Sequence, residues 1–110
     1  MKEILKFFMR LRAKVDNNQK EIVMSLRAAG FQVIHMHMIG RGFPDIIACR
    51  AKKCWFIEIK DGPKASFTSA QVEFYMDWQG PSIIVLTSIA DVDAFIANPT
   101  KYPNKVMKKF

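Results

Sequence analysis

The segment CWFIEIKDG, residues 54–62, places a glutamate and a lysine inside a stretch that otherwise has the composition of a buried strand. Apolar side chains alternate with and flank the two charged residues, Glu58 and Lys60. A buried carboxylate is costly unless it gains a partner charge, a shifted pKa or a metal ion. Glu58 and Lys60 are therefore the first candidates for chemistry.

A second carboxylate, Asp45, comes within reach if the neighbouring apolar segment pairs with this one. PDIIACR (44–50) and CWFIEIK (54–60) are short apolar runs joined by a polar turn, which predicts a hairpin. With the turn centred after Ala51, Asp45 opposes Glu58 on the same face of the sheet. Directly opposed residues have Cβ atoms roughly 4.5–5.5 Å apart, so the two carboxylates should meet.

Two carboxylates in apolar surroundings repel each other unless one is protonated or a cation lies between them. Mg²⁺ or Mn²⁺ suits such a pair, because these hard ions prefer oxygen ligands. Lys60 would lie beside the ion, placed to hold a water molecule or a phosphate. Two alternatives stay open. A register shifted by one residue would separate the carboxylates, and Glu58 with Lys60 could form an ion pair at the solvated end of an edge strand.

The surrounding segments predict an α/β fold, more closely an α+β mixed sheet with helices on both faces. Caps support the helix assignments: Asp16, Asn17 or Asn18 for one helix, Thr68 and Ser88 for two others. In chain order we expect a short amphipathic helix at 2–14, a helix at 15–30, strands at 31–38, 44–50 and 54–60, a helix at 67–80, a strand at 81–87 and a helix at 90–97.

A chain of 110 residues, half of them apolar, can form one small domain without disulfides or structural metal. Nothing approaches the roughly 20 apolar residues of a membrane span, and the first residues do not resemble a signal peptide. We therefore expect a cytoplasmic protein without a membrane partner. In that compartment Cys49 and Cys54 should stay reduced.

The net charge of +7 lies in the two ends of the chain. Residues 1–14 carry five basic side chains and one acidic one, and residues 98–110 carry four lysines and no acid. Residues 15–97, the expected core, have a net charge of −1. Basic ends suit a polyanion, with nucleic acid first and an anionic membrane surface second, although they also serve plain solubility.

The stretch GRGFPDIIACR followed by CWFIEIKDG resembles the core of the PD-(D/E)xK nuclease superfamily. Within that superfamily the chain is similar to the VRR-NUC type, including small phage-encoded and prophage-encoded members, from about Arg12 to Ala97. The resemblance implies a restriction-endonuclease-like αβββαβ core around a four-stranded sheet. It also implies a metal-dependent endonuclease acting on DNA, with structured DNA such as junctions as a possible substrate and a 5′-phosphate on the product.

The resemblance also implies roles for individual residues. Asp45 and Glu58 would bind Mg²⁺ or Mn²⁺, helped by the backbone carbonyl of Ile59. Lys60 would orient or activate the attacking water and stabilise developing charge. Glu21, on the helix expected at 15–30, would be a fourth member that acts through metal-bound water.

Gln71, a further candidate, and Glu21 also have local structural explanations. Gln71 and Tyr75 have the Q-x-x-x-Y spacing that lies beside the metals in some branches of the superfamily, so the resemblance implies a catalytic Gln71. Gln71 also follows Thr68 by three residues, which is the spacing of a capping box. Glu21 likewise follows Asn18 by three residues and could be a capping glutamate.

For nucleic-acid contacts we predict five side chains: Arg10, Lys14, Arg41, Lys64 and Tyr75. A homodimer acting on two strands is attractive for so small a domain, and no small-molecule substrate is expected. Two other functions stay open: a nucleic-acid-binding module that has the fold but does not cleave, and a basic partner-binding protein with its ends as docking arms. The sequence leaves undecided DNA against RNA, the preferred substrate structure, and one metal against two.

Overall fold

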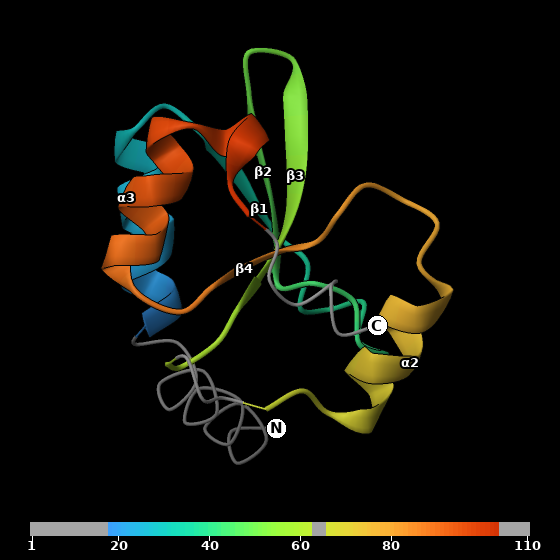
Figure 1. Ribbon diagram of the computed structural model, residues 1–110. Helices are drawn as coiled ribbons and strands as arrows, with labels where there is room; N and C mark the ends of the chain where they lie inside the picture. The colour runs from blue at the N-terminus through green and yellow to red at the C-terminus, as the bar shows by residue number, and fades with distance from the viewer. Residues whose placement is uncertain (1–17, 63–65, 104–110) are drawn as a thin grey trace, which may run out of the picture.

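A four-stranded mixed sheet forms the centre of the fold in the computed structural model, which describes residues 18–62 and 66–103 (Figure 1). The strands lie in chain order across the sheet. The first three are antiparallel, and the fourth runs parallel to the third. They are β1 (Gln32–His35), β2 (Ile46–Arg50), β3 (Lys53–Ile59) and β4 (Ile84–Leu86).

Helices cover both faces of this sheet, as the sequence predicted (Figure 1). Residues 18–28 are helical and lie with α3 (Ile89–Ala97) on one face, whereas α2 (Ser69–Asp77) lies on the other. A short 3-10 helix, η1 (Pro99–Lys101), follows α3. β3 and β4 are parallel neighbours, and parallel neighbours need a crossover connection. The segment that connects β3 to β4 contains α2.

The main hydrophobic core lies between the sheet and the two helices of the first face. Every second side chain along a strand points to the same face of the sheet, so alternate apolar residues of the strands form the side of the core that the sheet contributes. Burying each such side chain contributes roughly 1.5–3 kcal/mol. Its members are Ile22, Val23, Leu26, Phe31, Val33, Ile46, Ala48, Ile57, Ile84, Leu86, Val92 and Phe95.

Aromatic side chains fill the opposite face, under α2. The rings of Phe56 and Trp78 lie 5.1 Å apart, and those of Phe43 and Phe74 lie 5.5 Å apart. Phe74 and Trp78 are one helical turn apart and also contact each other, at 5.1 Å. This packing holds α2 against β3, and it thereby sets which face of the helix meets the polar end of that strand.

The predicted caps of two helices are confirmed, and one of the three cap candidates of the first helix, Asn18, is excluded. Thr68 caps α2 in a capping box with Gln71, and Ser88 accepts a hydrogen bond from the Asp91 amide at the start of α3. Asn18 lies inside its helix instead of capping it, and its side chain donates to the carbonyl of Lys60 at 2.9 Å. Asp16 and Asn17 lie outside the described residues.

The hairpin between β2 and β3 turns on two residues with left-handed backbone, Ala51 (φ 53°) and Lys52 (φ 64°). Arg50 and Lys53 flank the turn, and the next pair along the hairpin, Cys49 and Cys54, forms a disulfide. The prediction that they stay reduced was therefore wrong. It relied on the expected compartment, whereas the register brings the two Cα atoms to 4.1 Å.

Arg50 links the carboxyl-terminal ends of two helices to the hairpin. Its guanidinium donates to the carbonyls of Ala29 at 3.0 Å and Ile96 at 3.5 Å. It also lies over the ring of Phe31, 4.2 Å from the centroid. A cation at two helix C-termini is favourable, because the last carbonyls of each helix lack partners of their own.

Several element limits differ from the sequence prediction. β1 ends at His35 rather than at residue 38, because the chain turns there, with the Ile39 amide bonded to the Met36 carbonyl, to return toward β2. Packing extends past the predicted core limit at residue 97, since Tyr102 contacts the ring of Phe95. The helix expected at 2–14 and residues 104–110 of the basic tail lie outside the described residues. Within residues 18–62 and 66–103, no helix is both long and apolar enough to span a membrane.

Candidate active site

The register of the hairpin brings Asp45 and Glu58 together. Ile46 pairs with Ile57, so the next pair toward the open end of the hairpin is Asp45 with Glu58. The opposition predicted from the sequence is confirmed, and the shifted register is excluded. The Asp45 carboxylate also accepts a hydrogen bond from the Ile59 amide at 2.8 Å, which fixes it against β3.

Glu58 is the most deeply buried charged side chain of the site, with 2% of its surface exposed. One carboxylate oxygen, Oε2, accepts a hydrogen bond from the Gln71 amide at 2.5 Å and lies 3.4 Å from the Lys60 ammonium. The other oxygen, Oε1, is buried and accepts no hydrogen bond from the described residues. A buried oxygen acceptor without a donor is expensive, and it suits a cation.

Burial and the neighbouring carboxylate raise the pKa of Glu58. Loss of solvent has the largest effect and the charge of Asp45 the next, and together they outweigh the opposite effect of Lys60 and raise the pKa to about 8. Without a cation, the folded protein therefore favours the protonated form of Glu58 at neutral pH. A divalent ion between them would supply the missing positive charge, and two carboxylates are ligands that Mg²⁺ or Mn²⁺ prefers.

Gln71 connects the site to α2. Its side-chain oxygen accepts from the Lys60 ammonium at 2.7 Å and from the Thr68 amide at 3.0 Å, while its nitrogen donates to Glu58. The helix cap is confirmed, and the same side chain contacts Glu58 and Lys60, whereas a catalytic role for Gln71 stays a prediction. The side-chain amide of Gln71 therefore fixes the positions of Glu58 and Lys60 relative to the first turn of α2.

This arrangement of elements matches a known domain. A solved structure described as a VRR_NUC domain aligns with 77% of this chain and 96% of its own length, with a TM-score of 0.65 and 25% sequence identity. The chain has a VRR-NUC nuclease-type fold. A scan against protein families and a search of curated proteins find no match.

In this VRR-NUC fold, Glu21 does not join the two carboxylates as a third side chain. Glu21 is exposed, one turn along the helix from Asn18. Among the residues that the structure describes, no group of three or more His, Cys, Asp or Glu side chains could hold a metal ion. A role for Glu21 through metal-bound water, and one for the Ile59 carbonyl, stay predictions.

Tyr75 lies beneath the site rather than on the surface. It is 2% exposed, and its ring packs edge-on against Phe67 at 5.4 Å. Burial, followed by the charges of Glu58 and Asp45, raises the pKa of Tyr75 above its ordinary value, so the phenol stays neutral. The prediction of a direct nucleic-acid contact does not fit a side chain this buried. The Q-x-x-x-Y spacing does place Gln71 and Tyr75 on one face of α2, and that face meets the carboxylates.

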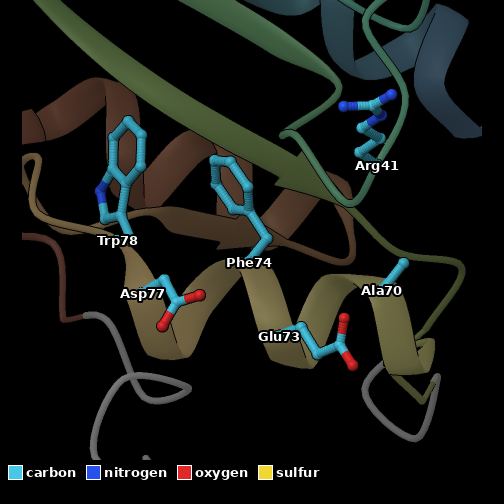
Figure 2. A pocket seen from close by; sticks show the side chains of 6 residues that line it. All are labelled: Arg41, Ala70, Glu73, Phe74, Asp77 and Trp78. Carbon is cyan, nitrogen blue, oxygen red and sulfur yellow. The ribbon is translucent and has the colours of Figure 1, made fainter.

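Arg41 is exposed on the loop before β2 and faces an open pocket of about 420 Å³ beside α2 (Figure 2). Figure 2 shows Phe74 and Trp78 pointing toward the sheet, with the carboxylates of Glu73 and Asp77 along the helix. Arg41 as a phosphate contact stays a prediction, and these acidic neighbours oppose a phosphate on the α2 side of the pocket. Three other predicted contacts, Arg10, Lys14 and Lys64, lie outside the described residues.

Two residues at the site were missed by sequence reasoning. The Asn18 side chain bonds the backbone of Lys60 and reaches the Thr87 carbonyl at 3.5 Å, which joins the ends of β3 and β4. The ring of Phe67 lies over the Lys60 ammonium, 4.8 Å from it. Both contacts join segments far apart in sequence, and neither residue type is distinctive of catalysis. The one available signal for Phe67 was its place directly before the cap, Thr68.

Proposed function

We propose that the protein is a Mg²⁺- or Mn²⁺-dependent endonuclease that hydrolyses phosphodiester bonds in DNA. The observation that carries this proposal is the buried oxygen of Glu58, without a hydrogen-bond donor among the described residues, opposite Asp45 and next to the Lys60 ammonium. The VRR-NUC nuclease-type fold supports it, and in this chain the pair lies at the open end of the hairpin of β2 and β3.

Each residue has a role in the proposed reaction. Asp45 and Glu58 would hold the ion, which supplies Lewis-acid chemistry at the scissile phosphate and acidifies a water molecule. The Lys60 side chain is 13% exposed, so its ammonium can reach that phosphate and stabilise the charge that develops on it. Gln71 keeps Lys60 and Glu58 in place from α2.

The charge of the chain supports DNA as the partner. The net charge of +7 favours the phosphate backbone, and such contacts position a duplex without reading its sequence. Structured DNA such as junctions, and a cytoplasmic location, remain proposals from the sequence. So does a homodimer, which the exposed apolar side chains of Ile34, Met38 and Ile39, at and just after edge strand β1, would suit.

A binding module that does not cleave is the second candidate. One observation favours it: within the described part of the chain, only two carboxylates converge, and no third metal-ligating side chain joins them. In that case DNA would bind through basic residues whether or not a divalent ion is present.

Cleavage of a labelled substrate panel separates the two candidates. Single strand, duplex, fork and four-way junction would be incubated with Mg²⁺, Mn²⁺ or EDTA. Asp45→Asn and Lys60→Ala would be compared with the wild type and with Asp93→Asn, an exposed carboxylate on α3 as the matched control. Metal-dependent cleavage lost in the first two variants and kept in the control is expected. Binding without cleavage in the wild type, shared by all variants, would leave only the binding module.

A further inference from the structure

Among the described residues, three groups hold the Lys60 ammonium: one from β3, one from α2 and one from the segment before α2. The ammonium donates to the Gln71 carbonyl oxygen at 2.7 Å and lies 3.4 Å from the Glu58 carboxylate. The third contact is the face of the Phe67 ring, whose centroid lies 4.8 Å from the nitrogen. The first two contacts are polar and point toward the carboxylate pair, whereas the third is aromatic and comes from the segment before α2.

Phe67 is itself fixed in place. Its ring packs edge-on against Tyr75, and it directly precedes Thr68, the residue that caps α2 in a box with Gln71. The turn at the start of α2 therefore positions both Phe67 and Gln71 next to the Lys60 ammonium. Phe67 is only partly buried and lies outside the main hydrophobic core, so one face of its ring is available to the Lys60 ammonium while its edge contacts Tyr75.

An aromatic face attracts a cation without accepting a conventional hydrogen bond from it. An ammonium group has three N–H donors; within the described part of the chain, Gln71 accepts a hydrogen bond from one of them, and the Glu58 carboxylate forms an ion pair on a second side. A third polar partner would occupy the remaining donor. The Phe67 ring instead holds the cation, keeps water off one side of it, and leaves that donor for a phosphate oxygen.

We propose that Phe67 is a positioning residue that places the Lys60 ammonium for phosphate contact through a cation–π interaction. This inference rests on the proposed nuclease function. Phe67 acts through Lys60 and does not touch the reacting atoms. Its removal should therefore lower kcat and leave the affinity for DNA nearly unchanged.

A series of fluorinated phenylalanines at position 67 tests the proposal, because fluorine weakens the negative face of the ring while the ring keeps its shape. Across mono-, di- and trifluoro-phenylalanine, kcat should fall stepwise by about two- to fivefold in total, with KM and the melting temperature nearly constant. Phe67→Leu should lose at least as much, and Phe67→Tyr should restore most of it. A purely packing role would give no dependence on fluorine number.

A measurement without catalysis tests the geometry. In the wild type, the ring should shift the NMR signals of the Lys60 side-chain protons nearest the nitrogen upfield, and Phe67→Leu should abolish that shift. Cleavage by the wild type with kcat independent of fluorination, or the absence of the NMR shift, would overturn the role of Phe67 alone. Absence of metal-dependent cleavage by the wild type would overturn the proposed function, and this role with it.

Discussion

Replacing Glu58 with glutamine should stabilise the metal-free protein at pH 8 while it abolishes cleavage. The buried carboxylate of Glu58 lies opposite Asp45, and its pKa is raised from the ordinary 4.5 to about 8. Glutamine keeps the shape and can still accept the hydrogen bond from Gln71, but it carries no charge. A residue that we propose holds a cation is thus expected to be a source of instability when the cation is absent.

The sign follows from proton linkage. Below pH 4.5 Glu58 is protonated in both states, so its raised pKa has no cost. Between pH 4.5 and 8 the unfolded chain releases this proton while the folded chain keeps it, and the stability of the fold decreases as the pH rises. The full shift corresponds to roughly 5 kcal/mol. Glutamine also loses the ion pair with Lys60, so we expect a net gain of about 1–3 kcal/mol at pH 8.

Urea and thermal unfolding in EDTA, at pH 5 and pH 8, would measure this gain. For a domain of this size, each kcal/mol corresponds to a rise in Tm of about 4–8 °C. Glu73→Gln, on the exposed side of α2, is the matched control and should change little. Mg²⁺ or Mn²⁺ should then stabilise the wild type but not Glu58→Gln. A Glu58→Gln variant that is less stable than wild type at pH 8, or equally stabilised at both pH values, would refute this reasoning.

Three further predictions concern stability away from the carboxylates. Arg50→Met should lower the free energy of unfolding by about 1–3 kcal/mol, because two helix ends lose a charged donor. Ala51→Asn with Lys52→Gly should raise it by about 1–2 kcal/mol, because these residues suit the left-handed backbone of the turn. Reduction of the bond between Cys49 and Cys54 should lower it by about 1–2 kcal/mol, since the loop it closes is short. Urea unfolding measures all three.

Each of these has a control and a contrary outcome. Arg50→Lys should lower the free energy of unfolding less than Arg50→Met does, but should not restore the wild-type value, because an ammonium lacks the planar fork of N–H donors with which a guanidinium contacts both carbonyls. A wild-type value in Arg50→Lys would contradict the capping role. Lys53→Gly, at an exposed position without left-handed backbone, should not stabilise as Lys52→Gly does. Equal unfolding midpoints with and without reductant, the redox state being verified by thiol titration, would contradict the last prediction.

The fold and the carboxylate pair could be predicted from the sequence because both depend on local rules. Strand side chains alternate with a period of two, and a short polar turn sets the register, so the opposition of Asp45 and Glu58 follows from counting residues. Capping residues mark the starts of α2 and α3 in the same way. The disulfide could have been predicted from the same register, which already paired Cys49 with Cys54.

What surrounds the carboxylates depended on tertiary packing. Aromatic side chains seat α2 on β3, and the resulting rotation of the helix decides that Gln71 reaches the charged pair and that Tyr75 is buried beneath it. The rotation is the sum of many contacts between distant segments, and no local pattern encodes it. The sequence by itself determined which groups could bind a metal ion. Only the tertiary structure decided which neighbours, Asn18 and Phe67 among them, hold Lys60 in position, because that depends on how separate elements pack.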